Sequence, residues 1–167
     1  FTQPCARLTR SWFMHESDES NDFDDFDLTL PLGCLVTFRT YGTWLHGDDR
    51  GSVDREHNVP GTPLVPTNPA RQSYERRLLS RPPVFLGPRR REATRVAIVD
   101  ACKLRGWYLH ALNVRTNHVH LVATTDVLAR TVLSTMKARA TAHMRRLGCW
   151  SHDRSPWAMG GSARTIW

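Results

Sequence analysis

The sequence predicts one α+β domain, and three observations support this prediction. Two runs of apolar residues have the spacing of amphipathic helices, and four shorter runs have the composition or the alternation of β-strands. Along the chain these runs follow the order β-α-β-β-α-β. A chain of 167 residues is also long enough to bury one substantial core.

The first half of this pattern contains a strand, a long insertion and a helix. Leu35–Tyr41 is rich in β-forming residues and predicts the first strand. From about 47 to 88 the chain is dense in Gly, Pro, Asp and Asn, which predicts a long loop insertion with a short helix at Pro69–Ser80. Pro88 suits the first turn of the next helix, and Gly106 suits its end. The apolar stripe of that helix comprises Ala93, Ala97, Ala101 and Leu104.

The second half contains two strands, a helix and a last strand. Trp107–Val114 and Asn117–Thr124 predict neighbouring strands joined by a short turn. Thr125 and Asp126 are expected to cap the following helix. The tail at 157–167 predicts a fourth strand that follows a Gly-Gly bend. The apolar stripe of the second helix comprises Leu128, Val132, Met136, Ala140, Met144 and Leu147.

This order predicts a sheet with one uncovered face. Right-handed crossovers place both helices on one face of a four-stranded antiparallel sheet, which is the ferredoxin-like arrangement. Alternate side chains of the third strand point to opposite faces, so Val119 and Leu121 meet the helices while His118 and His120 face outward. The two imidazoles then lie about 6–7 Å apart at the backbone and are able to converge on one divalent ion.

The charge of the chain is uneven. Residues 1–32 hold two basic and seven acidic residues, which gives them a net charge of −5. The whole chain carries +7, so the net charge of residues 33–167 is +12. The acidic segment has no core-forming periodicity and predicts a disordered leader. Among the basic residues only Lys103 and Lys137 are lysines. A basic, arginine-rich body indicates a polyanionic partner, although a GC-rich genome would also favour arginine codons.

The spacing of the cysteines and the length of the apolar runs bear on the cellular compartment. The four cysteines have no close spacing, which argues against a zinc knuckle or a disulfide framework and fits a reducing cytoplasm. No stretch approaches the roughly 20 apolar residues of a membrane span, so no membrane partner is expected.

Three segments resemble one known family. They read TNHVHLV at 116–122, YGTWLHGDDRGSVD at 41–54 and WAMGGSARTIW at 157–167. In this order they resemble the REP-associated tyrosine transposases, which belong to the single-tyrosine HUH transposase superfamily. The resemblance covers about residues 33–167. It implies a nuclease domain for single-stranded or hairpin DNA, associated with the bacterial nucleoid and acting as a monomer or a homodimer.

The resemblance also implies a metal site and a nucleophile. His118 and His120 match the histidines that bind Mg²⁺ or Mn²⁺ in the family. The family's tyrosine lies on a helix after the fourth strand, beside a polar third metal ligand, and forms a 5′-phosphotyrosine link with DNA. This chain has only Tyr41, Tyr74 and Tyr108, none at that position, so the nucleophile is expected beyond Trp167. A truncated record, a decayed gene product and a domesticated DNA-binding remnant are the competing explanations.

Several residues are candidates for DNA contacts. Basic side chains hold phosphates and aromatic side chains stack on unpaired bases. For each basic residue the alternative is a solvated surface charge, and for Trp44 it is a place in the core. Arginines at 89–91 begin a helix, where cations oppose the macrodipole, which hints at an anionic partner there. The candidates are Trp44, Arg50, Arg55, Arg115, Lys137 and Arg139.

Two other functions remain open. The first is a noncatalytic nucleic-acid-binding module that uses the bare sheet and the basic patch. The second is an RNA-binding domain of the RRM type, which the histidines disfavour because they stand where that class has aromatic side chains.

Overall fold

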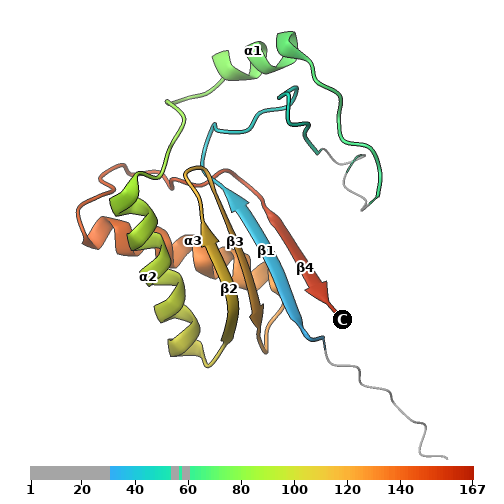
Figure 1. Ribbon diagram of the computed structural model, residues 1–167. Helices are drawn as coiled ribbons and strands as arrows, with labels where there is room; N and C mark the ends of the chain where they lie inside the picture. Colours follow the sequence, from blue (N-terminus) through green and yellow to red (C-terminus); the bar gives the residue numbers. More distant parts are fainter. Residues whose placement is uncertain (1–30, 54–56, 58–60) are drawn as a thin grey trace, which may run out of the picture.

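The computed structural model describes residues 31–53, 57 and 61–167, which form a four-stranded antiparallel sheet covered by helices on one face (Figure 1). The strands are β1 (Gly33–Arg39), β2 (Tyr108–Val114), β3 (His118–Thr124) and β4 (Ser162–Ile166), and their order in the sheet is β2-β3-β1-β4. All but the last two residues of the predicted leader lie outside the described residues.

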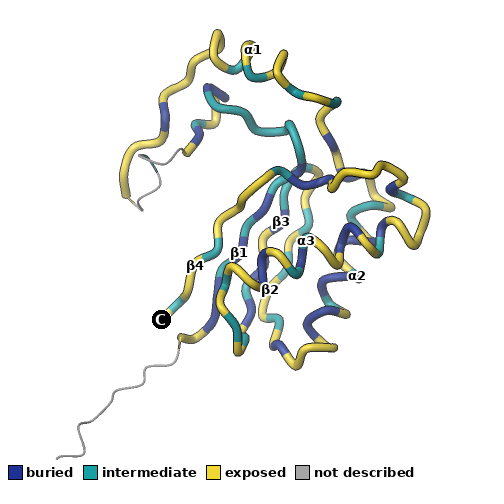
Figure 2. Tube along the Cα trace, turned by 180° about the vertical axis from the view of Figure 1, so that it is seen from behind, coloured by how far each residue is buried: buried dark blue, intermediate teal, exposed yellow. Residues whose placement is uncertain are grey.

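Two long helices lie against the sheet and one short helix stands apart. Helix α2 (Pro88–Arg105) and helix α3 (Ala129–Arg146) pack on each other and on the same face of the sheet, as the views from both sides show (Figures 1 and 2). Helix α1 (Pro69–Arg77) belongs to the segment beyond one end of the strands. The predicted α+β fold, with a four-stranded antiparallel sheet and two helices on one face, is therefore confirmed. None of the described helices is long and apolar enough to cross a membrane.

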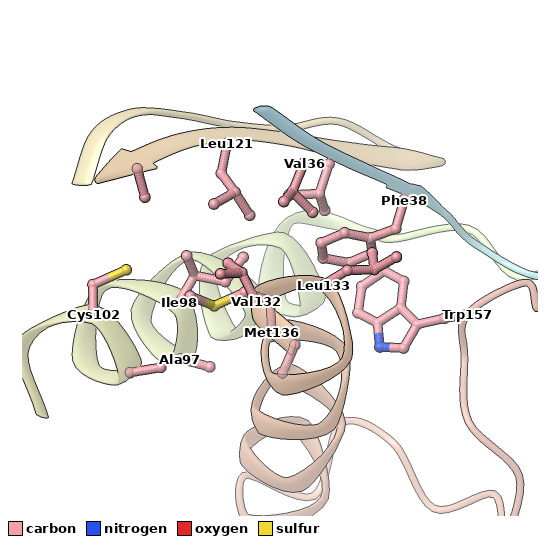
Figure 3. Close-up of a cluster of buried hydrophobic side chains, with 14 of the residues drawn as sticks. Val36, Phe38, Ala97, Ile98, Cys102, Leu121, Val132, Leu133, Met136 and Trp157 are labelled. Atoms are coloured by element: carbon pink, nitrogen blue, oxygen red, sulfur yellow. The ribbon is translucent and has the colours of Figure 1, made fainter. Parts of the chain in front are cut away.

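The core lies between the sheet and the two long helices. Alternate residues of the central strands, including Phe38 and Leu121, point toward α2 and α3 (Figure 3). The Trp157 ring packs edge-on against Phe38, with ring centres 4.8 Å apart. The predicted stripe of α2 is buried except at its last residue, Leu104, which is 71% exposed. The stripe of α3 is buried at its centre but exposed at both ends, Leu128 and Leu147.

Local signals explain where α2 begins and ends, but the expected cap of α3 is wrong. Pro88 starts α2, and Gly106 ends it in the left-handed conformation. Helix α3 instead begins after Leu128, without a side-chain cap. The Asp126 carboxylate accepts a hydrogen bond from the Trp107 indole at 2.7 Å, and Thr125 Oγ1 donates to the Val127 carbonyl. Neither side chain of the predicted cap is therefore directed at the helix.

Part of the insertion is joined firmly to the domain. Val84 and Leu86 are buried in the core, and the Leu86 amide donates to the Thr116 carbonyl at 2.7 Å. At the other end, Gly47 has a positive φ and lies so close to the Asn68 carbonyl that a side chain would collide with it. The insertion thereby brings the start of α1 against the loop that follows β1.

The arginines at the start of α2 bind the end of α3. Arg89 donates to the Leu147 carbonyl at 2.6 Å, and Arg90 donates to the Cys149 carbonyl at 2.9 Å. These carbonyls lie at the negative end of α3, where cations are favourable. The arginines hold two helix ends together, which explains their position without an external anion.

Replacing Met136 with Ala is expected to lower the free energy of unfolding by about 2–5 kcal/mol, because it removes a fully buried side chain from the centre of α3. Leu128→Ala, at the exposed start of the same helix, serves as the control and is expected to change it by less than about 0.5 kcal/mol. Urea denaturation measures both. Equal losses in the two variants would contradict the described core.

Candidate functional site

The candidate site lies on the uncovered face of the sheet. In the antiparallel register His118 pairs with Arg39, and His120 pairs with Thr37 on one side and Asn113 on the other. Directly paired residues point to the same face, so these five side chains share the open face. The alternate residues of β3, Val119 and Leu121, are buried on the opposite face, as the alternation of the sequence predicts.

Each of the two imidazoles is oriented by a hydrogen bond between its Nδ1 atom and a neighbouring side chain. Their ring centres lie 4.7 Å apart at an interplanar angle of 74°. His118 Nδ1 lies 2.8 Å from the Asn117 side-chain oxygen, and His120 Nδ1 lies 2.8 Å from Thr37 Oγ1. The Asn117 oxygen accepts only, so His118 Nδ1 carries the hydrogen and its Nε2 is unprotonated. The Thr37 hydroxyl is able to accept from His120 Nδ1 in the same way, and that tautomer leaves Nε2 of His120 unprotonated as well. This is the usual arrangement of histidines that bind a metal, in which the other ring nitrogen donates to a neighbouring group.

Burial and the neighbouring charges favour the neutral form of both imidazoles. Burial, then the proximity of His120 and of Arg115, lowers the pKa of His118 below its ordinary value. Burial and Arg115 also lower the pKa of His120. Because only the neutral imidazole binds a metal, both shifts favour metal binding at neutral pH.

The residues fit a divalent ion only in part. The two Nε2 atoms supply two ligands, and the described part of the chain contains no group of three or more His, Cys, Asp or Glu side chains able to hold a metal. A site with two protein ligands leaves positions open for solvent or substrate oxygens. His118 and His120 are therefore the residues able to hold such an ion.

Trp44 lies in the loop after β1, in contact with Arg39, the register partner of His118. Its ring lies under two guanidinium groups, with Arg39 Cζ 3.9 Å and Arg50 Cζ 4.5 Å from the ring centre. Its indole N–H donates to the Gly51 carbonyl at 2.8 Å. Trp44 is thus neither a core residue nor a free surface ring, and a base would have to displace an arginine to stack on it.

Arg50 is bound by a buried carboxylate. Its Nε and one terminal nitrogen donate to the two oxygens of Asp48 at 2.6 and 2.7 Å, a bidentate pair. Asp48 is only 6% exposed, and the hydrogen bonds from Arg50 hold its pKa well below the usual range. The charge of Arg50 is therefore largely offset by Asp48.

The other predicted DNA contacts are dispersed. Arg115 is exposed in the turn between β2 and β3, and its amide donates to the His118 carbonyl. Lys137 instead donates to the carbonyls of Ala158 and Gly160 and fastens the chain before β4. Arg139 lies on the helix layer, in a shallow cavity between α2 and α3. Arg55 lies outside the described residues.

A large open cavity runs beside the site, along the edge of the sheet at β4. Its volume is about 940 Å³. Arg39, Arg130 and Arg164 line it, and so does one carboxylate, Glu75. The three arginines outnumber this carboxylate and give the cavity a net positive lining.

None of the three tyrosines accompanies the histidines. Tyr108 pairs with Thr124 and lies four residues along β3 from His120, about 13 Å at strand spacing. The Tyr41 hydroxyl lies 3.2 Å from Ser80 Oγ and accepts a hydrogen bond from the Ser80 amide. Tyr74 is an exposed residue of α1.

Sequence reasoning missed Thr37, Arg39 and Asp48. A signal for the first two exists in the alternation of β1, because Val36 and Phe38 must be buried and their neighbours must therefore face outward. No local signal marks Asp48, because its partner and its burial depend on how the loop folds.

Comparisons with known proteins give no assignment: no protein-family model matches the chain, and no curated protein matches it.

Asp48→Asn is expected to lower the free energy of unfolding by roughly 1.5–3 kcal/mol at pH 7, because it weakens charge-assisted hydrogen bonds in a buried setting. The pKa of Asp48 is lower in the folded state, so its contribution is present above the ordinary aspartate range and is lost as pH falls from about 5 toward 2. Denaturation at several pH values measures this. Asp49→Asn is the control, because the Asp49 side chain is 89% exposed and approaches Arg50 only to 4.0 Å; an equal effect would contradict the role of Asp48.

Proposed function

We propose that residues 33–167 form a HUH-type domain that binds single-stranded or hairpin DNA and holds Mg²⁺ or Mn²⁺ through His118 and His120. The observation that carries this proposal is the pair of imidazoles on the open face. Each has its Nδ1 occupied by a neighbouring side chain, which leaves Nε2 available. When bound, the ion polarises a phosphate oxygen and offsets its charge.

The rest of the open face supports a nucleic-acid ligand. Arg39 and Arg115 lie beside the histidines, and their charges favour phosphate. Farther along the same face the Tyr108 ring, 67% exposed, lies 4.7 Å from the His110 ring. Exposed rings on an uncovered sheet favour stacking with unpaired bases, which a duplex does not offer.

Binding without cleavage is the second candidate function, and the placement of the tyrosines favours it. Strand cleavage of the HUH type requires a tyrosine beside the metal, and Tyr41, Tyr74 and Tyr108 all lie elsewhere. The residues described therefore support recognition of DNA and positioning of a phosphate. Cleavage would require a tyrosine that these 167 residues do not supply.

His120→Ala is expected to weaken Mn²⁺ binding at least tenfold. Mutation of a residue that only hydrogen-bonds to a metal ligand already lowers metal affinity 10–100-fold, and His120 is proposed to be a ligand itself. Titration followed by the Mn²⁺ paramagnetic resonance signal measures the affinity. The matched control is His110→Ala, which removes an exposed histidine of the same face whose Nε2 lies 2.8 Å from Thr124. Equal Mn²⁺ affinity in wild type and His120→Ala would reject the metal site.

A labelled DNA hairpin with a single-stranded extension is expected to bind at least about tenfold more tightly than a blunt duplex of equal length. One stacked base contributes about 1–3 kcal/mol, and the duplex has none to offer. Fluorescence anisotropy at several salt concentrations measures both affinities. Equally weak binding of the two substrates, with equal salt dependence, would mean that only net charge attracts DNA and would overturn the proposed function.

A further inference from the structure

Arg39 lies beside the site without the carboxylate partner that the neighbouring Arg50 has. Its neighbour Arg50 is held by both oxygens of Asp48. Within the part of the chain that the structure describes, the Arg39 guanidinium makes no hydrogen bond or ion pair. It makes a cation–π contact instead, with its Cζ atom 3.9 Å from the centre of the Trp44 ring. Such a contact holds the guanidinium in place while leaving its N–H groups free.

The position of Arg39 directs this unpaired cation at the candidate site. Arg39 is the register partner of His118, so the two side chains leave the same face with Cβ atoms about 4.5–5.5 Å apart. Arg39 also lines the large cavity at the β4 edge, together with Thr37 and Arg164. It therefore lies where the histidine pair and the cavity meet.

The surroundings make an unpaired guanidinium costly at this point. Arg39 is partly buried, and burial together with the charge of Arg50 lowers its pKa, against a smaller opposing effect of Asp48. An arginine nevertheless remains protonated at any physiological pH. A bound anion would relieve both the desolvation and the repulsion. Because Trp44 already restrains the side chain, little further rotational freedom would be lost on binding.

We propose that Arg39 is a phosphate-binding residue, which holds a backbone phosphate of the nucleic acid next to His118 and His120. Trp44 is then a positioning residue, which orients Arg39 rather than stacking on a base. Asp48 neutralises Arg50, so Arg39 and not Arg50 is the group available to phosphate. This inference rests on the proposed function and adds one assigned phosphate contact to it.

The test compares Arg39→Gln with wild type for binding a labelled 12-nucleotide single strand in EDTA, so that metal binding does not contribute. One phosphate contact fewer is expected to reduce the slope of log affinity against log salt by about 0.7. We also expect a severalfold loss of affinity at low salt. The control is Arg95→Gln, which removes an equal charge from the outer side of α2, where Arg95 pairs with Glu92, and is expected to leave the slope unchanged.

A second measurement needs no variant. Labelling of wild-type arginines with phenylglyoxal, read by mass spectrometry, is expected to show protection of Arg39 by the oligonucleotide and none of Arg95. Wild-type binding with an unchanged slope in Arg39→Gln, or with Arg39 unprotected, would overturn the assignment of Arg39 alone. Failure of wild type to bind the strand at any salt would overturn the proposed function together with it.

Discussion

The antiparallel pairing of β1 with β3 is the constraint on which the rest of the structure depends. It places Val36 and Phe38 beside Leu121 and Val119, so that one face of the two central strands forms the wall of the core. The same register necessarily places Thr37 and Arg39 beside His120 and His118 on the other face. A shift by one residue would exchange the two faces, exposing the apolar set and burying the imidazoles and a guanidinium. The stability of the core therefore determines the geometry of the candidate site, and no separate energy is needed to bring its residues together.

The open face concentrates positive charge, and the chain compensates only part of it. Asp48 is the buried carboxylate of this region, and it holds Arg50 by a bidentate contact. Arg39 and Arg115 remain. In addition to burial, both charges lower the pKa of His118, and Arg115 also lowers the pKa of His120. Unpaired guanidinium groups favour a negatively charged ligand, and the neutral imidazoles beside them leave room for a cation bound together with it. A phosphodiester has this character. The ion and the phosphate would each reduce the repulsion that the other meets.

Many of the basic residues serve the fold instead. Arg89 and Arg90 bind carbonyls at the end of α3, and Lys137 binds carbonyls of the chain that leads into β4. Carbonyls at a helix end or in a loop lack a partner within their own element, and a long cationic side chain can reach them from a neighbouring element. These contacts reduce the number of charges available to a polyanion. Net charge is a property of the whole chain, whereas the contacts decide which basic side chains remain unpaired.

The sequence by itself determined the order of the strands and helices, the faces of β3, and the outward direction of His118 and His120, because these follow from local periodicity. It could not determine the start of α3, where Asp126 accepts a hydrogen bond from Trp107, the residue before β2, instead of capping the helix. It also could not determine the contacts of Arg39, the burial of Asp48, or the position of Trp44 against two guanidinium groups. Each of these depends on residues brought together by strand register or by the folded loop after β1. Alternation and propensity act over a few neighbouring residues, whereas ion pairs, stacked cations and buried carboxylates are decided by which distant segments meet.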